Sequence, residues 1–151
     1  MKKLFIALAL CLVMVSVIAT PAFAATQKVD LMKWGGPSNP DVKAGYATFI
    51  TDQGDAALVV RITLTNAYPK TKYEVHLMTE CGGNYTLGTL ATNSRGKWGG
   101  QNEQYEFAQV LPAGQHTVSL ELWQWYDGAF DPDSKSNIWT DHSITVNITR
   151  N

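Results

Sequence analysis

Two segments decide the fold class: AYPKTKYEVHL at residues 67–77 and LGTLATNSRG at residues 87–96. In each, a turn adjoins a run in which apolar or aromatic residues alternate with polar ones, the period of a β-strand with one buried face. Pro69 pre-sets the first turn, and Gly96 ends the second. Gly88 predicts a β-bulge or the close approach of another strand. Both segments therefore predict antiparallel β-structure.

The same alternation continues on both sides of these segments. It is strongest at residues 57–65, with Leu58, Val60, Ile62 and Leu64 on one face. In the strand predicted around the second segment, strict alternation puts four residues on one face: Tyr85, Leu87, Thr89 and Ala91. Further strands are predicted at residues 26–34, 45–51, 105–111, 116–122 and about 138–149. Seven or eight short strands without a credible helix after residue 25 are typical of a β-sandwich or a barrel.

Three sequence motifs lie along this pattern of strands and turns. They are Pro69-x-Thr71-x-Tyr73-x-Val75-x-Leu77, Leu87-Gly88-Thr89-Leu90-x-Thr92-Asn93-x-x-Gly96, and Leu111-Pro112-Ala113-Gly114 followed by a Val-x-Leu strand. Together they resemble a loose group of exported bacterial and archaeal β-sandwich domains of mostly unassigned function. The resemblance covers residues 45–122 and implies an all-β, antiparallel, immunoglobulin-like sandwich, although the Cys-Trp-Cys spacing of true immunoglobulin domains is absent. Its motifs are turn and strand residues, so it concerns fold more than function.

The first 24 residues have the composition of a secretory signal peptide. A basic start precedes an apolar run over residues 4–18 and a small-residue cleavage site at residues 22–24. An uncleaved anchor is the alternative, but the run is shorter than the roughly 20 residues of a spanning helix. Residues 25–151 are therefore expected to form a single exported domain, extracellular or periplasmic, without stable membrane insertion.

Charge and cysteine content narrow the expectations for this domain. Removing residues 1–24 takes away two of twelve basic residues and none of thirteen acidic ones, which leaves a net charge of −3. Nucleic acid and anionic lipid are therefore not expected as main partners. Cys11 belongs to the predicted signal peptide, so Cys81 has no intrachain partner. Cys81 is either an inert thiol or the site of an intermolecular disulfide.

No catalytic grouping is recognisable. His76, in an outward phase, and His116 and His142 occur far apart without His-x-His spacing, so each is expected to have its own hydrogen-bond partner. There is no Gly-x-Ser-x-Gly elbow and no phosphate-binding glycine loop. Acids in loops, such as Asp127 and Asp131, are expected to be solvated. The chain is therefore not expected to be an enzyme or to require a cofactor.

One acidic loop, residues 127–137, offers hard oxygen ligands. Asp131, Asp133 and Asn137 stand at alternate positions, as calcium-binding loops require. The loop departs from an EF-hand, because Lys135 stands where an acid is expected and no terminal bidentate glutamate follows. Weak calcium binding and a solvated turn are the two alternatives.

Five large rings surround this loop: Trp123, Trp125, Tyr126, Phe130 and Trp139. A regular strand with its leucines inward would place the rings at 123 and 125 on the outer face. Exposed together, the five would form a platform for sugar rings or for another protein, because flat rings stack and their polar edges hydrogen-bond. Alternatively, the loop folds back and buries them as a small satellite core.

These features favour a secreted, non-catalytic binding or surface-interaction module that recognises glycan or protein through the aromatic cluster. The alternative is a structural component of the cell envelope or extracellular matrix that associates through an exposed sheet edge. A glycosidase-like enzyme is the third hypothesis.

Overall fold

The computed structural model describes residues 25–51, 57–98 and 105–148. The expected signal peptide at residues 1–24 lies outside this part, as do the predicted turn at residues 52–55 and most of the loop that precedes Tyr105. Within the described ranges the regular structure is entirely β, and no helix is long and apolar enough to cross a bilayer.

Ten strands make up the described part, where the sequence predicts seven or eight. They are β1 (Thr26–Lys33), β2 (Val42–Thr51), β3 (Ala57–Leu64), β4 (Lys72–Thr79), β5 (Asn84–Ala91), β6 (Tyr105–Val110), β7 (Gly114–Tyr126), β8 (Ala129–Asp131), β9 (Ile138–Thr140) and β10 (Ile144–Ile148). Strand β8 forms inside the predicted acidic loop. The predicted last strand is divided, because β9 pairs with both β1 and β7 whereas β10 pairs with an earlier part of β7.

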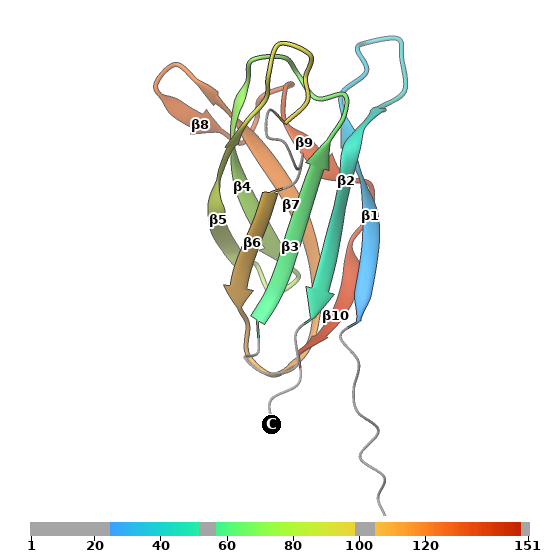
Figure 1. Cartoon of the computed structure of the whole chain (residues 1–151), viewed down its shortest axis with the longest axis vertical. Coiled ribbons are helices and arrows are strands. Elements are labelled where there is room, and N and C mark those ends of the chain that lie inside the picture. Colours follow the sequence, from blue (N-terminus) through green and yellow to red (C-terminus); the bar gives the residue numbers. More distant parts are fainter. Residues whose placement is uncertain (1–24, 52–56, 99–104, 149–151) are drawn as a thin grey trace, which may run out of the picture.

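All pairs are antiparallel and join the strands in the order β5-β4-β7-β9-β1-β2-β3-β6. Strand β7 is central to this sheet: β4 pairs along one side of it, and β10, β9 and β8 follow one another along the other. The sheet curls into a nearly closed, barrel-like arrangement (Figure 1). The connections β1–β2, β3–β4 and β7–β8 lie at the end drawn uppermost, together with residues 92–98 that follow β5.

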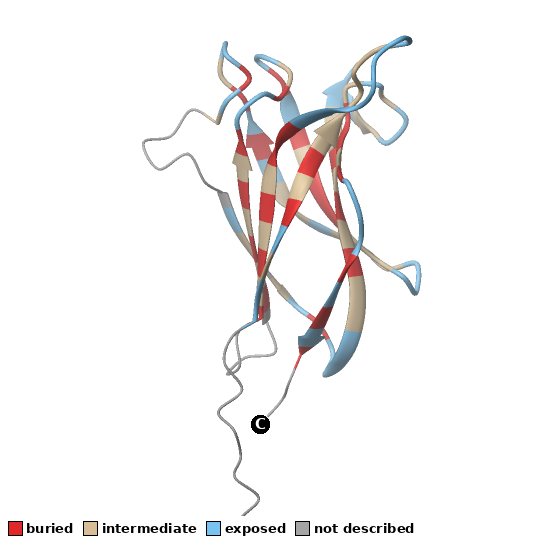
Figure 2. Ribbon diagram, turned by 90° about the vertical axis from the view of Figure 1, so that its right-hand side faces the viewer, coloured by how far each residue is buried: buried red, intermediate tan, exposed pale blue. Residues whose placement is uncertain are grey.

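The interior is filled by the inward residues of the alternating pattern. The largest fully buried side chains are Tyr73, Phe49, Leu31, Leu58, Ile62, Leu64, Leu77, Leu111, Leu120, Leu122, Ile138 and Ile148. The face predicted for Leu58, Val60, Ile62 and Leu64 on β3 and the inward leucines predicted for β7 are confirmed. Figure 2 shows buried residues alternating with less buried ones along the strands. Each of these side chains contributes roughly 1.5–3 kcal/mol of hydrophobic free energy when buried.

Strand β5 departs from its predicted phase. The pairing of β4 with β5 skips Leu87, which is therefore the extra residue of a β-bulge. Beyond the bulge the phase reverses, so that Leu90 is buried while Thr89 and Ala91 are exposed. The prediction of one phase for the whole strand was wrong, whereas the predicted irregularity at Gly88 is confirmed.

This irregularity lies where β5 and β6, the first and last strands in the order, approach each other. A Cβ atom at Gly88 would lie 2.7 Å from Cε1 of Phe107 on β6, so the phenyl ring occupies space that another residue at position 88 would fill. Side-chain packing thereby joins β5 to β6, which share no described ladder of hydrogen bonds.

Residues of the first two sequence motifs meet in one corner. Thr92 Oγ1 accepts a hydrogen bond from the Thr71 amide at 2.9 Å and donates one to the Tyr68 carbonyl at 2.6 Å. The Ala67 amide donates to the Gly96 carbonyl at 2.9 Å. These bonds lock the β3–β4 connection to the β5–β6 connection, so the motif residues have a structural role.

Candidate functional site

Three strands align polar and aromatic residues on the outer face of the sheet. Directly opposite one another on β4, β7 and β9 are His76, Glu121 and Trp139. The adjacent pair on β4 and β7 is Glu74 with Trp123. Opposed residues of antiparallel strands point to the same face. The leucines that alternate with them on β7 are buried, so these five residues point away from the core.

His76 lies beneath the indole of Trp123. The two ring centroids are 3.6 Å apart and the ring planes are inclined by 24°. Nδ1 of His76 is 2.7 Å from Asn84 Oδ1, and Nε2 is 2.8 Å from Glu74 Oε2. The outward phase predicted for His76 is confirmed, but the residue is only 3% exposed. The stacked indole accounts for this burial.

Trp123 is also tied to Glu121. Its indole Nε1–H donates a hydrogen bond to Glu121 Oε2 at 2.8 Å. Oε1 of Glu121 makes no hydrogen bond to any residue that the structure describes. The stack and the hydrogen bond therefore restrain one carboxylate oxygen and leave the other available at the surface.

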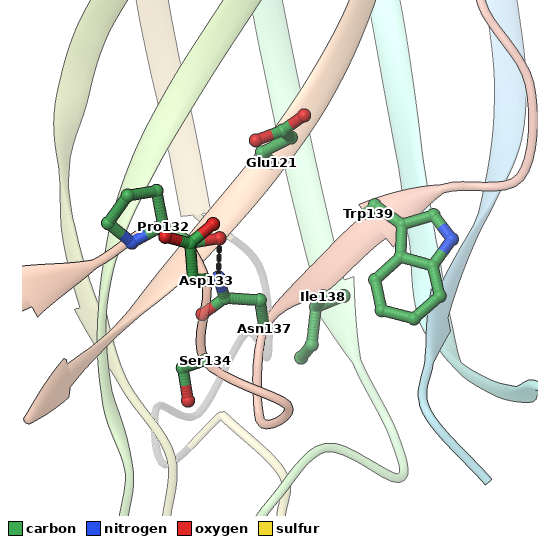
Figure 3. A pocket seen from close by; sticks show the side chains of 7 residues that line it. All are labelled: Glu121, Pro132, Asp133, Ser134, Asn137, Ile138 and Trp139. Atoms are coloured by element: carbon green, nitrogen blue, oxygen red, sulfur yellow. Dashed lines mark hydrogen bonds between the residues drawn. The ribbon is translucent and has the colours of Figure 1, made fainter.

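Two shallow pockets adjoin Glu121 and Trp139, which line both of them. The first, of about 220 Å³, lies against the β8–β9 connection and is also lined by Pro132, Asp133, Ser134, Asn137 and Ile138 (Figure 3). The second, of about 300 Å³, lies toward the β9–β10 connection and is also lined by Ser119, Leu120, Thr140, Asp141, His142 and Ser143. Since they share two residues, we describe them together as the Trp139 groove.

Asn137 holds one wall of this groove. Its Nδ2 donates hydrogen bonds to the carbonyls of Asp131 and Pro132 at 2.9 and 2.7 Å, and its Oδ1 accepts one from the Gln124 amide at 2.8 Å. Ser134 Oγ donates to Gln124 Oε1, also at 2.8 Å. These bonds fix the β8–β9 connection to β7, so the wall of the first pocket is held by the domain's own hydrogen bonds.

The same bonds bear on the calcium hypothesis. The side-chain oxygen of Asn137 faces a backbone amide, and Asp131 Oδ1 accepts a hydrogen bond from the Asp133 amide at 2.9 Å. Oxygens named as ligands are thus engaged in closing the turn. Among the described residues, no group of three or more His, Cys, Asp or Glu side chains could hold a metal ion. The bonds favour the turn closed by its own side chains, and calcium binding stays a prediction.

The five predicted aromatic residues do not form a single platform. Trp123 covers a histidine, and Trp139 lies in the groove. Trp125 and Phe130 pack edge to face at 4.8 Å on the β7–β8 hairpin. Tyr126, at the tip of that hairpin, is 66% exposed. The structure therefore combines partly buried ring pairs with an exposed ring, features of both alternatives considered for these residues.

The β7–β8 hairpin projects from the end of the sheet as a separate surface (Figure 1). Asp127 and Gly128, with φ of 48° and 89°, form its tight turn. Nζ of Lys72 lies 5.0 Å from the ring centroid of Trp125 and 5.6 Å from that of Phe130. This cation covers part of the apolar ring surface, although Trp125 is still 42% exposed.

The remaining histidines and the cysteine lie outside the row on β4, β7 and β9. His116 Nε2 is 2.8 Å from the Pro112 carbonyl, and His142 Nδ1 is 2.7 Å from Asp141 Oδ1, so each histidine has its own partner as predicted. Cys81 is an exposed free thiol in the β4–β5 turn. An intermolecular disulfide there stays a prediction.

Glu74, Asn84 and Glu121 were not among the site residues predicted from the sequence. In isolation they are ordinary polar positions of strands and turns. The sequence did contain one indication of these residues, because residues two apart on a strand share a face. That spacing relates Glu121 to Trp123 and Glu74 to His76. The contact between the two pairs required the register of β4 with β7, which the sequence does not state.

No protein-family model, no curated protein and no solved structure matches this chain. The Trp139 groove is therefore interpreted from its own chemistry. Its walls combine one indole with carboxylates, hydroxyls and an amide. This set can pack against a flat, partly apolar ring and hydrogen-bond to polar groups on the rim of that ring.

Proposed function

We propose that this chain is a secreted, non-catalytic module that binds glycan in the Trp139 groove. The observation that carries the proposal is the half-buried indole of Trp139 between two adjoining pockets lined by hydrogen-bonding groups. Sugar rings present apolar C–H faces that stack on flat aromatic surfaces, while their hydroxyls require polar partners beside the stack.

Preorganisation of the groove supports this function. The Glu121 carboxylate is restrained by Trp123, and Asn137 holds the β8–β9 connection through three hydrogen bonds. A ligand that enters such a site loses less free energy to the ordering of side chains and loops. A hydroxyl-rich ligand benefits most, because each of its contacts contributes little free energy by itself.

A protein partner is the second candidate, and the β7–β8 hairpin favours it. Trp125 and Tyr126 are exposed there, and aromatic residues are enriched in protein interfaces. Assembly into an envelope or matrix structure through a sheet edge has less support. Phe107 packs against Gly88 where β5 and β6 face each other, which leaves less of either edge accessible to another chain.

We also propose that the chain is secreted after loss of residues 1–24 and that its domain is an immunoglobulin-like sandwich, as the sequence led us to expect. Ala25 is bonded to Thr51 through both its amide and its carbonyl, which supports a mature domain that starts at that residue. The strand groups β5-β4-β7-β10 and β1-β2-β3-β6, joined through the three-residue strand β9, support an immunoglobulin-like sandwich.

A glycan-array screen followed by calorimetric titration of the purified protein tests this function. We expect saturable binding of at least one oligosaccharide and a roughly five- to tenfold loss in Trp139→Ala, because a stacked ring contributes about 1–1.5 kcal/mol. Trp125→Ala is the matched control: it removes a more exposed indole outside the groove and should leave the affinity unchanged. Loss of binding in Trp125→Ala but not in Trp139→Ala, or the absence of any glycan ligand, would overturn the proposal.

A further inference from the structure

We infer that the Trp139 groove selects amino sugars, oligosaccharides whose rings carry free ammonium groups. This inference rests on the proposed function and adds to it the charge class of the ligand. Its basis is the distribution of charge along a groove that already has an aromatic wall. Glu121 lines both pockets, Asp133 lines the first and Asp141 lines the second, whereas neither pocket is lined by lysine or arginine.

The lysine of the connection that borders the first pocket is directed elsewhere. Lys135 is the one lysine in the β8–β9 connection, and its Nζ lies 5.0 Å from the ring centroid of Trp34 rather than in the groove. The carboxylate of Asp133 makes no hydrogen bond or ion pair with any described residue. The first pocket therefore presents carboxylate oxygens of Glu121 and Asp133 that are available to a positively charged ligand.

The second pocket differs in one respect. Its Asp141 carboxylate is 2.7 Å from Nδ1 of His142, a pair that is largely exposed to solvent. Glu121 lines both pockets, and its carboxylate has no ion-pair partner among the described residues. We therefore assign the stronger ammonium contact to the first pocket and the weaker one to the second.

The arrangement of the acids favours an extended organic cation over a metal ion as the ligand of the groove. A metal requires several ligand atoms around one centre, and no such group occurs among the described residues. The acids of the groove instead follow one another along two adjoining pockets, on either side of Trp139. In an oligomer of glucosamine, each successive ring carries one ammonium group. The hydroxyls of the lining are suited to the ring hydroxyls between them.

The test compares two tetrasaccharides of one backbone, in which N-acetylation replaces each ammonium group by an uncharged amide. Purified protein is titrated with a tetrasaccharide of glucosamine and with the N-acetylated tetrasaccharide of the same linkage, at low and at high salt. We expect the glucosamine oligomer to bind at least about tenfold more tightly at low salt, and this preference to shrink at high salt. Trp139→Ala should weaken both ligands, since it removes the stacking surface that they share.

Variants that neutralise single carboxylates test which residues of the groove select the charged ligand. Glu121→Gln and Asp133→Asn preserve the size of the side chain and remove its charge, and each should reduce glucosamine binding by about three- to fivefold, a larger loss than for the acetylated ligand. Asp127→Asn is the matched control, because Asp127 is an exposed acid of the hairpin turn outside the groove. It should change neither affinity.

Three results would overturn the inference. Equal affinity for the two tetrasaccharides at low salt would refute charge selection and leave the proposed glycan function standing. Glucosamine binding that persists undiminished in both carboxylate variants would refute its location. Binding of oligolysine but of no saccharide would show a cationic peptide as the ligand, and would also refute the proposed function.

Discussion

Gly96 illustrates how much one residue of the β3–β4/β5–β6 corner is constrained. Its φ of +69° lies in the left-handed region, where glycine carries no steric penalty. A Cβ atom at this position would also overlap the carbonyl oxygen of Ala67. The same two residues are joined by a backbone hydrogen bond, so neither can move away without breaking the corner.

Gly96→Ala should therefore destabilise the domain by about 2–4 kcal/mol, the sum of backbone strain and a collision with main-chain atoms. Urea unfolding measures the change. Gly82→Ala is the control: Gly82 has a φ of +78°, but a Cβ there would meet nothing within 4 Å, so only the backbone cost of about 1 kcal/mol is expected. Equal losses in the two variants would contradict the close approach.

At the scale of elements, the β8–β9 connection behaves as a structured wall rather than a solvated loop. Asn137 is 8% exposed and satisfies three backbone groups at once. Because these partners belong to β7 and to the connection itself, one amide side chain determines where the first pocket of the Trp139 groove lies. A loop of acids thus acquires a defined shape from its most buried polar residue.

Asn137→Ala should cost about 2–4 kcal/mol of stability, since it leaves one amide and two carbonyls without their partner. Thermal and urea unfolding give this value. Ser136→Ala, one position earlier, removes a hydroxyl that makes no hydrogen bond to a described residue and should stay within about 0.5 kcal/mol of the parent. A neutral Asn137→Ala variant would show that the connection is held by other contacts.

At the scale of the whole molecule, the protonation of Tyr73 is coupled to the integrity of the core. Tyr73 is fully buried, and this burial raises the pKa of its phenol well above the ordinary value. The Tyr68 backbone and the Thr71 hydroxyl oppose the shift, but neither reaches the geometry of a hydrogen bond. An ionised phenolate in this position requires that the core open to water.

Stability should therefore fall as the pH rises above about 10, the pKa of tyrosine in the unfolded chain. Above that pH the unfolded chain releases the proton while the folded chain retains it, so each further unit costs about 1.4 kcal/mol until the folded pKa is reached. Urea unfolding between pH 8 and 11 should show this slope. Tyr73→Phe should reduce it, and the remainder is attributed to Tyr68, whose pKa is raised first by burial and then by Asp41.

Two controls make this prediction specific. Tyr126→Phe alters a ring that is 66% exposed on the hairpin and should leave the alkaline slope unchanged. At neutral pH, Tyr73→Phe should remain within about 1 kcal/mol of the parent, because the lost hydroxyl has no hydrogen-bond partner among the described residues. An unaltered alkaline slope in Tyr73→Phe would contradict the coupling.

Predictability from sequence differed between the core and the candidate site. The outward phase of Trp123 and the inward phase of Leu122 follow from the two-residue period of a strand, and both are confirmed. The same rule failed in β5, where the extra residue Leu87 reversed the phase. It also missed the burial of His76, because period alone does not reveal that an indole on the next strand covers a polar residue.

Local chemistry therefore determined the all-β class, the positions of β1 to β7 and the inward residues that close over the core. These properties depend on neighbours along the chain, through steric preference and the alternation of burial. Only the tertiary structure decided that Glu121 stands between His76 and Trp139, that Asn137 anchors the acidic connection, and that five aromatic residues separate into different surfaces. Such relations depend on the register between strands distant in sequence, and a shift of one residue would reverse every face involved.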